Sequence, residues 1–455
     1  MTTVLKFGGT SVGSAEAIRR AVDIVKATEG PRVVVVSATA GTTDLLAEAA
    51  QAAARGDGEA ANRTLTELGE RHGAIARELG VHPGMSEVVS RTAALLNSVA
   101  VLHECTPRTL DAIWSYGERV AMRIVSAALA GAGVKAGECD ATLFIVTDDS
   151  FGSASPDMAR TRERSHARLG PMLALGMTPV VTGFIGATPD GIVTTLGRGG
   201  SDFSAAIVAA SIGADRLLIY TDVSGVMSAD PRIVADARPL AAISYAEASE
   251  LSYFGAKVIH PRTVRPAVEA GIPVRILNTF APEDPGTTVT GRTPADGSIV
   301  KATTSLGGLG LVTVQGAGMS GVPGFAAKVF DTTAAEGVSV LMISQSSSEN
   351  SICFVVPQGS AERLRGALER TLARELGRHD VERVTVEAPV AIVAAVGEGM
   401  RGTPGVAARV FGALGRAKVN VIAIAQGSSE LNISLAVADR DREAAVRAIH
   451  AEFHR

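Results

Sequence analysis

Two glycine-containing turns in the N-terminal half of the chain carry side chains suited to holding anions. The string KFGGTSVG places Lys6 at the end of an apolar run, ahead of Gly8 and Gly9, whose backbone N–H groups can approach an oxyanion closely. A Thr-Ser pair follows that can cap a helix. Because the lysine precedes the glycines, the string is not a Walker A loop, and a plain strand-to-helix turn is the alternative.

The second turn lies in TTLGRGGSDFSAAIVAASIG, where Arg198 enters the turn and Ser201 and Asp202 begin an apolar helix. Asp202 could instead be a simple N-cap. Two such turns in one body suit phosphoryl transfer, which depends mainly on positioning and on neutralising charge. A third string, LLIYTDVSGVMSADPR at 217–232, puts polar residues after a buried strand, where open α/β sheets bind ligands; a surface loop is the alternative.

The elements that must position these turns follow an alternating pattern. Apolar runs such as VLKF and RVVVVSA alternate with stretches of helical periodicity, which predicts a mostly parallel α/β sheet covered on both faces. We expect further strands at 134–139, 142–147, 178–184, 215–221 and 273–277. We expect helices at 14–28, 43–54, 60–80, 85–104, 107–131, 201–213, 246–253 and 261–271. The stretch 281–298, rich in Pro, Gly, Thr and Asp, is the best candidate for a linker.

An internal repeat follows at a spacing of about 81 residues. Residues 312–356 align with 393–437 without a gap, with about 20 of 45 positions identical. Each copy predicts strand, glycine turn, helix, strand, strand and helix, and Gln345 of SQSSSE corresponds to Gln426 of AQGSSE. The second copy lacks a final strand. The segment 299–305 could supply it, which would nest one module in the other.

Both copies open with GxGxxG, as GAGMSG at 316–321 and GEGMRG at 397–402. This is the context of a dinucleotide fingerprint and suggests a dehydrogenase as a rival reading. The second strand of each copy ends in Gln345 or Gln426 instead of the acid that binds a ribose hydroxyl, and each copy is too short for half of a doubly wound sheet. A tight turn before a helix is therefore favoured.

Composition excludes several classes of protein. The 455 residues include 43 Lys and Arg against 47 Asp and Glu, so no basic excess indicates a nucleic-acid or membrane-surface partner. The three cysteines, Cys105, Cys139 and Cys353, are far apart, which fits a reducing compartment and predicts neither disulfides nor a metal site. The N-terminus is not typical of a signal peptide, and no apolar span of about 20 residues occurs. We expect a cytoplasmic protein.

Five ordered strings carry a resemblance to a known family: KFGGTSVG, WSYGERVAMRI, LGRGGSD, YTDVSGVMSADPR and ELSYFGAKVIHPRT. Together with the paired tail modules they resemble aspartate kinase, of the amino-acid kinase fold. The resemblance implies a catalytic domain at 1–290 and two ACT-like βαββαβ modules at 299–388 and 389–455. The modules are most similar to those of bifunctional aspartokinase–homoserine dehydrogenases. Since no dehydrogenase region follows Arg455, we expect a monofunctional kinase.

The resemblance implies transfer of the ATP γ-phosphoryl group to the side-chain carboxylate of L-aspartate. The product would be 4-phospho-L-aspartate, in the first step toward lysine, threonine and methionine. Lys6 would neutralise the transferring phosphoryl, with Gly8 and Gly9 donating backbone N–H groups. Asp202 would organise Lys6 and would not act as a strong base, because a carboxylate nucleophile carries no proton to remove.

The remaining implied roles concern the two substrates. Arg198 would grip a substrate carboxylate and Glu118 the substrate ammonium. Glu118 could instead form a structural bridge with a neighbouring arginine, Arg119 or Arg123. The implied aspartate pocket also contains Ser37, Thr43 and Ser201. The implied nucleotide contacts are Thr221, Asp222, Arg232 and Lys257, with Mg²⁺ carried mainly by the ATP phosphates.

Two further expectations concern a departure from the family pattern and the role of the repeated glutamines. Met227 replaces a tyrosine usual in the family, which puts that nucleotide contact in doubt. Gln345 and Gln426 would bind an amino-acid effector, threonine or lysine, because an amide can both donate and accept; capping of strand ends is the alternative. ACT modules commonly pair between subunits, so we expect a homodimer or larger assembly. The rival functions are another amino-acid kinase and a catalytically decayed amino-acid sensor.

Overall fold

The computed structural model describes residues 1–255, 261–291 and 298–454. By their contacts these residues form two compact units. The first comprises residues 1–226, 239–245 and 261–291, and the second comprises 227–238, 246–255 and 298–454.

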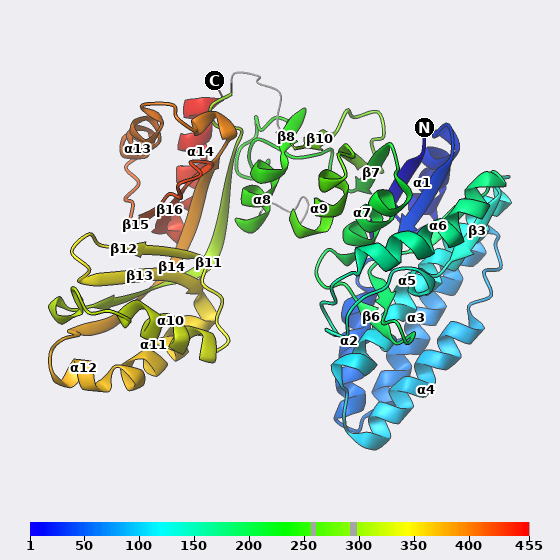
Figure 1. Ribbon diagram of the computed structural model, residues 1–455, viewed down its shortest axis with the longest axis horizontal. Helices are drawn as coiled ribbons and strands as arrows, with labels where there is room; N and C mark the ends of the chain where they lie inside the picture. The colour runs from blue at the N-terminus through cyan, green and yellow to red at the C-terminus, as the bar shows by residue number, and fades with distance from the viewer. Residues whose placement is uncertain (256–260, 292–297, 455) are drawn as a thin grey trace. The chain divides into compact units, whose positions relative to one another are not determined.

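The first unit is built on a mixed sheet in which most neighbours are parallel (Figure 1). The strand order is β3 (Ala136–Cys139), β4 (Thr178–Thr182), β2 (Arg32–Val36), β1 (Thr3–Phe7), β7 (Arg216–Thr221), β9 (Val274–Asn278), β10 (Thr287–Thr290) and β8 (Ala242–Ser244). All pairs are parallel except β9 with β10. The mostly parallel α/β sheet predicted from the alternating pattern is confirmed.

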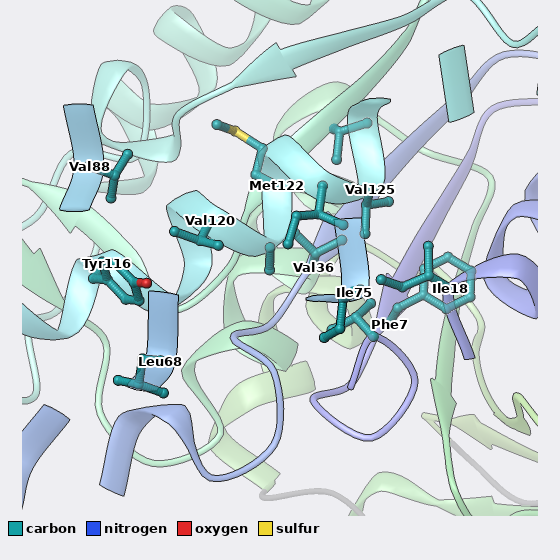
Figure 2. Packing of buried hydrophobic residues seen from close by; sticks show 14 of the residues in the cluster. Phe7, Ile18, Val36, Leu68, Ile75, Val88, Tyr116, Val120, Met122 and Val125 are labelled. Atoms are coloured by element: carbon teal, nitrogen blue, oxygen red, sulfur yellow. The ribbon is translucent and has the colours of Figure 1, made fainter. Parts of the chain in front are cut away.

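Helices pack against both faces of this sheet. They are α1 (Ala15–Ala27), α2 (Thr42–Ala54), α3 (Gly58–Leu79), α4 (Ser86–Leu102), α5 (Pro107–Gly131), α6 (Met158–Ala174), α7 (Gly200–Ile212) and α9 (Pro261–Glu269). Helices α1 to α5 share one apolar core with Phe7 and Val36 of the sheet, in which Leu68 and Tyr116 are also buried (Figure 2). Side chains alternate along a strand, so Lys6 points away from the face that Phe7 covers. Helix α7 contacts β1, β2 and β7.

Two expectations for this unit were wrong. Residues 142–147 do not form a strand: Ala141–Leu143 is a 3₁₀ turn (η1), and Val146 makes only an isolated bridge to Ala187. The run is apolar because Phe144 and Ile145 are fully buried, not because it pairs in a sheet. A separate hairpin of β5 (Ile185–Ala187) and β6 (Val193–Thr195) lies in this region.

The predicted linker at 281–298 also contains structure. Thr287–Thr290 forms β10, in which Val289 is 1% exposed and pairs with Val274. The polar composition of this stretch suggested a loop. Only alternate residues of a strand face the core, however, so a strand as short as β10 needs few apolar residues. Residues 292–297 of the same stretch lie outside the described part of the chain.

The second unit contains an antiparallel sheet crossed by two long strands (Figure 1). Its order is β12 (Met342–Gln345), β13 (Ser351–Pro357), β11 (Ala302–Gln315), β14 (Arg383–Val396), β16 (Asn432–Ala438) and β15 (Ala423–Ala425). Its helical elements are α8 (Tyr245–Tyr253), η2 (Ala317–Met319), α10 (Phe325–Ala335), α11 (Gln358–Thr371), α12 (Ala373–Gly377), η3 (Glu398–Met400), α13 (Val406–Arg416), η4 (Asp439–Asp441) and α14 (Arg442–Phe453).

The two long strands are each shared between the repeat copies. The second half of β11 pairs with β13 and with the first half of β14, and this part belongs to the first copy. The first half of β11 pairs with the second half of β14, as Ala302 with Val396 shows, and β14 pairs there with β16. Val300, just before β11, is buried in the core of the second copy with Val393 and Leu435. A segment before the first copy thus completes the core of the second.

Truncating Val300 tests this shared architecture. Val300→Ala removes apolar volume from the core of the second copy and is expected to cost about 1–3 kcal/mol. Val322→Ala, at a valine of the same unit that is 50% exposed, is the control and should change stability by less than about 0.5 kcal/mol. Amide hydrogen exchange of β14 and β16 would measure both effects. Equal protection in the two variants would show that the segment before β11 contributes nothing to the second copy.

Candidate active site

A buried ion pair links β1 to the start of α7. The Nζ atom of Lys6 lies 2.7 Å from Oδ1 of Asp202, and the two side chains are only 9% and 16% exposed. Lys6 is directed away from the Phe7 face of the sheet, and Asp202 lies in the first turn of α7. The N-cap of α7 is Gly199, so Asp202 is not the N-cap that sequence reasoning left open.

The turn after β1 packs closely against the loop after β2. A Cβ atom on Gly9 would lie 2.8 Å from the carbonyl oxygen of Ala38, which explains the glycine. The N–H of Gly8 donates to the carbonyl of Tyr220 at 3.0 Å, so it is already used within the chain, whereas the Gly9 N–H has no hydrogen-bond partner among the described residues. The helix cap is Ser14, which accepts from the Ala17 N–H, and not the Thr-Ser pair three residues earlier.

A cavity of about 470 Å³ opens beside the ion pair. The turn after β1, the loop after β2, α5 and the turn before α7 form its walls. Eight of the predicted site residues line it: Lys6, Gly9, Ser37, Thr43, Glu118, Arg198, Ser201 and Asp202. The residues proposed to neutralise a phosphoryl group and those proposed to bind aspartate therefore share one cavity.

Glu118 offers this cavity one carboxylate oxygen without a partner. The side chain is buried; Oε1 accepts the Ala38 N–H at 3.2 Å, and Oε2 has no hydrogen bond. Burial raises the pKa of Glu118 to about 8, against the smaller lowering effects of the Ala38 N–H and the Arg119 charge. The positive charge of a bound ligand group would lower this pKa again and so restore the ionised carboxylate of Glu118.

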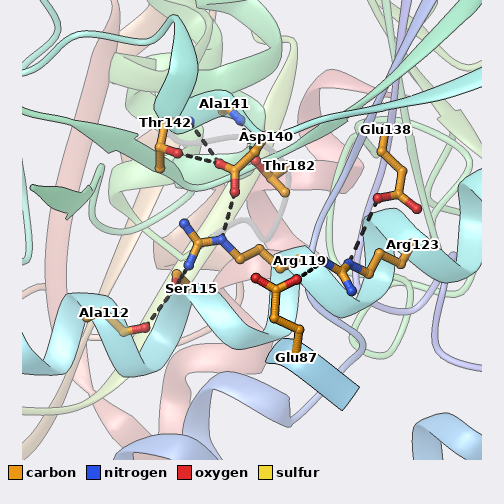
Figure 3. Close-up of polar contacts among 10 residues, drawn as sticks. All are labelled: Glu87, Ala112, Ser115, Arg119, Arg123, Glu138, Asp140, Ala141, Thr142 and Thr182. Carbon is orange, nitrogen blue, oxygen red and sulfur yellow. Dashed lines mark hydrogen bonds and ion pairs between the residues drawn. The ribbon is translucent and has the colours of Figure 1, made fainter. Parts of the chain in front are cut away.

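The neighbouring arginines are engaged elsewhere (Figure 3). The Nε of Arg119 lies 2.7 Å from Asp140, and Arg123 lies 3.3 Å from Glu87 and 3.9 Å from Glu138. The alternative reading of Glu118 as one half of a structural bridge with either arginine is therefore wrong.

Arg198 is the cationic counterpart of Glu118 in the cavity. It lies in the exposed turn between β6 and α7 and has no ion-pair or hydrogen-bond partner in the part of the chain that the structure describes. A free guanidinium is suited to bidentate binding of a carboxylate. The cavity thus presents an unpaired cation at Arg198 and a buried carboxylate oxygen without a partner at Glu118.

Two aromatic residues of the cavity were missed by sequence reasoning. Trp114 and Phe184 both line it, with ring centroids 6.2 Å apart. Trp114 was detectable, because it lies four residues before Glu118 and so shares its helix face. Phe184 has a positive φ of 63°, and a Cβ atom on Gly200 would lie 2.5 Å from its ring. No sequence signal marks such a strained position in advance.

Comparisons with known proteins identify the family. The Amino acid kinase family matches residues 1–278, and the ACT domain matches 312–372 and 393–453. Aspartokinase 3, chloroplastic, of Arabidopsis thaliana is 34% identical over all of this chain and 82% of its own length. E. coli aspartokinase III in complex with lysine and aspartate aligns over the full length of both chains, with 34% identity and a TM-score of 0.83.

The chain belongs to the aspartate kinase family. It also resembles the bifunctional aspartokinase/homoserine dehydrogenase of Daucus carota, with 36% identity over all of this chain and 51% of that protein. The chain therefore spans about half the length of the bifunctional relatives that it matches.

The predicted nucleotide residues that follow α7 in this aspartate kinase family member belong to both units. Thr221 ends β7, next to the carbonyl that receives the Gly8 N–H, and its hydroxyl donates to Asp222 at 3.1 Å. Arg232 belongs to the second unit, where it is 82% exposed and lies 2.6 Å from Asp230. Met227, half-buried, is in the same segment. Lys257 lies outside the described residues.

The predicted effector residues occupy equivalent corners of the two ACT modules. Gln345 ends β12 and lines a cavity of about 320 Å³ at the N-terminus of α10. Gln426 follows β15 and is exposed. In each module a glutamate near this corner accepts a hydrogen bond from the glycine turn. Glu349 accepts the Gly321 N–H at 2.9 Å, and Glu430 accepts the Gly402 N–H at 2.7 Å.

The glycine motifs that suggested a dinucleotide site are explained by packing. A Cβ atom on Gly316 would lie 2.2 Å from the carbonyl oxygen of Asp380, and one on Gly397 would lie 2.5 Å from that of Ile299. These glycines are therefore required for the close approach of neighbouring backbone, which needs no bound nucleotide. The structure favours the tight turn over the dehydrogenase reading.

Among the described residues, no group of three or more His, Cys, Asp or Glu side chains could hold a metal ion. No helix in that part of the chain is both long and apolar enough to cross a bilayer.

Proposed function

We propose that this chain is an aspartate kinase, which transfers the γ-phosphoryl group of ATP to the side-chain carboxylate of L-aspartate. One observation carries the proposal. A single cavity contains the buried Lys6–Asp202 pair together with Arg198 and Glu118, whose unpartnered atoms are complementary to the α-carboxylate and α-ammonium of a free amino acid. Membership of the aspartate kinase family supports the same assignment.

The acceptor half of the site binds and orients aspartate. Arg198 binds the α-carboxylate and Oε2 of Glu118 binds the α-ammonium. The hydroxyl groups of Ser37, Thr43 and Ser201 line the same cavity and complete the pocket. The reacting side-chain carboxylate is already ionised, so the reaction needs orientation and charge neutralisation and no general base.

The donor half places positive charge where the phosphoryl group passes. Lys6 neutralises the transferring group, Asp202 fixes the Lys6 ammonium from 2.7 Å, and the open N–H of Gly9 donates to a phosphate oxygen. Thr221 at the end of β7 and Asp222 directly after it contact the nucleotide. A crystal structure of E. coli aspartokinase III contains aspartate and ADP, which supports these two substrates.

Magnesium fits this site as a companion of the nucleotide. The carboxylate nearest to the transfer point, Asp202, is already paired with Lys6, and the described residues offer no preformed cage of ligands there. The ion would be held mainly by the phosphates and water, and when bound it neutralises phosphate charge.

The ACT modules are proposed to carry feedback regulation by threonine or lysine. Gln345 lines a cavity large enough for an amino acid, and the related E. coli enzyme was crystallised with lysine. Assembly into a homodimer or larger oligomer through these modules is part of the same proposal. It is supported by Ile343 and Ile424, which are 49% and 45% exposed on the edge strands β12 and β15. We place the protein in the cytoplasm, again as a proposal.

Two alternatives are less well supported. Another amino-acid kinase would share the Lys6–Asp202 pair but needs no matched Arg198 and Glu118. A decayed sensor would be expected to have lost the ion pair, which is intact. Neither the dehydrogenase activity nor the partners of the bifunctional relatives are proposed for this chain.

Removing Lys6 tests the proposed chemistry. Lys6→Ala should lower kcat for ATP and L-aspartate by at least about a thousandfold, because the charge that stabilises the transferring phosphoryl is lost. The assay traps acyl phosphate as hydroxamate. Lys26→Ala, at an exposed lysine of α1, is the control and should keep full activity. Near-normal turnover by a folded Lys6→Ala protein would remove Lys6 from the mechanism, and turnover of only a different acceptor by the wild type would favour another amino-acid kinase.

The raised pKa of Glu118 predicts a pH dependence of aspartate binding. In the free protein Glu118 is mostly protonated below its pKa of about 8, and only the ionised form attracts the substrate ammonium. The KM for aspartate should therefore fall as pH rises from 6.5 to 8.5, by up to about tenfold per unit. Glu118→Gln should raise KM by about 10- to 100-fold and abolish this slope. Glu87→Gln, at an exposed carboxylate, should leave the slope unchanged, and a persistent slope in Glu118→Gln would assign it to another group.

Replacing the two corner glutamines tests the effector sites. Gln345→Ala and Gln426→Ala should each weaken inhibition by threonine or lysine by about tenfold with uninhibited kcat retained, because each removes hydrogen bonds to the ligand. Activity is titrated with each amino acid alone and with both together. Gln358→Ala, at an exposed glutamine of the same unit, is the control. Unchanged inhibition in both corner variants would favour strand capping as the role of these glutamines.

A further inference from the structure

A buried polar network lies behind the loop that lines the acceptor half of the cavity. His72 of α3 is 0% exposed; its Nε2 lies 2.9 Å from Oγ1 of Thr39, and its Nδ1 lies 3.3 Å from the Tyr116 hydroxyl. Thr39 also shares a 2.7 Å hydrogen bond with Thr42. Neither His72 nor Tyr116 lines the cavity, so neither can touch a substrate bound there.

The network is uncharged at physiological pH. Burial, with a smaller contribution from the Arg71 charge, lowers the pKa of His72 to about 4. Burial also raises the pKa of Tyr116 to about 12. A neutral imidazole has one donor and one acceptor nitrogen, and each faces a hydroxyl group that can serve as its complement. Both ring nitrogens are thereby satisfied without a buried charge.

The loop after β2 is fixed by this network from one side and by α5 from another. Arg71, next to His72, donates to the carbonyl of Ala40 at 2.6 Å. On the α5 side, Gly117 lets the loop approach, since a Cβ atom there would lie 2.6 Å from the Cβ of Ala38. The Ala38 N–H in turn donates to Glu118. The same few residues that hold the loop therefore also orient Glu118.

We propose that His72 is a positioning residue for the amino-acid acceptor. It fixes the loop that presents Ser37 and Thr43 to the cavity and, through Tyr116, the turn of α5 that carries Glu118. This inference rests on the proposed aspartate kinase activity. The turn that carries Gly9 touches this loop, since the Ala40 N–H donates to the Gly9 carbonyl at 3.1 Å, but it has its own anchor in the hydrogen bond from Gly8 to Tyr220. The effect of His72 should therefore fall mainly on the acceptor.

The test compares the change in KM for aspartate with the change in KM for ATP. His72→Phe keeps an aromatic ring of similar size and removes both hydrogen bonds. It should raise KM for aspartate about tenfold or more, as expected for the loss of one to two hydrogen bonds, while KM for ATP stays within about twofold. Tyr116→Phe, a milder variant that removes one hydroxyl, should raise KM for aspartate by about two- to fivefold.

Replacing His72 by Gln or by Asn distinguishes its contact with Thr39 from its contact with Tyr116. The amide of His72→Gln can reach the position of Nε2 and keep the contact with Thr39, whereas that of His72→Asn reaches only the position of Nδ1. If the loop is the element that His72 positions, Gln should restore KM for aspartate better than Asn. Thr92→Val, which removes another buried hydrogen bond in the same unit, is the control and should change heat stability without changing either KM.

A second readout does not depend on turnover. Amide hydrogen exchange of residues 37–43 should be faster in His72→Phe than in the wild type or in Thr92→Val. Unchanged exchange there, or equal changes in both KM values, would overturn the inference. Absence of turnover with aspartate in the wild type would refute the proposed activity instead, and the exchange result alone would then decide whether His72 positions the loop.

Discussion

The pairing of Lys6 with Asp202 is the interaction on which the proposed active site depends. A lysine ammonium and a carboxylate that are almost closed off from water can coexist only when they are held at hydrogen-bond distance. One comes from the end of β1 and the other from the first turn of α7, so β1 and α7 must meet with little freedom. The parallel pairing of β1 with β2 and β7 provides that constraint, because it brings three strand ends to one edge of the sheet.

Because these strand ends meet at one edge of the sheet, the turn after β1, the loop after β2 and helix α5 must also approach one another closely. Gly9 is pressed against the carbonyl of Ala38, and Gly117 of α5 is pressed against the Ala38 side chain. The Ala38 N–H is left to bind Glu118, and Oε2 of that carboxylate is left without a partner. Small residues thus have a double role: they allow the loop to lie between β1 and α5, and they bury an acid whose raised pKa a cationic ligand can lower again.

Much of this could be predicted from the sequence, because the decisive residues lie in local strings with recognisable chemistry. Lys6, Arg198, Asp202 and Glu118 come from three separate strings, and the structure places all four around one cavity. What the sequence could not give depends on long-range packing. Phe184 in its strained conformation and the contact of His72 with Thr39, 33 residues away, have no local signature. The strand at 287–290 was hidden by a polar, glycine-rich composition typical of loops.

The repeat shows how duplicated sequence can acquire unequal surroundings. The corners at Gln345 and Gln426 keep the same backbone geometry, since Glu349 and Glu430 both have a φ of 55° and both accept a glycine N–H.

In the second module, however, α8 also contributes carboxylates: Glu247 accepts the Glu398 N–H at 2.8 Å, and Glu250 accepts from the Asn432 amide. Helix α8 carries the start of the ELSYFGAK string and is docked on the second module through these contacts. A ligand that displaces η3 or β16 would therefore act on α8 through these carboxylates. One bound at the Gln345 corner would act through the Tyr253 hydroxyl of α8, which donates to the carbonyls of Val340 and Leu341 just before β12, and through the strands that the modules share. Two copies of one sequence thus give two physically different routes for regulation.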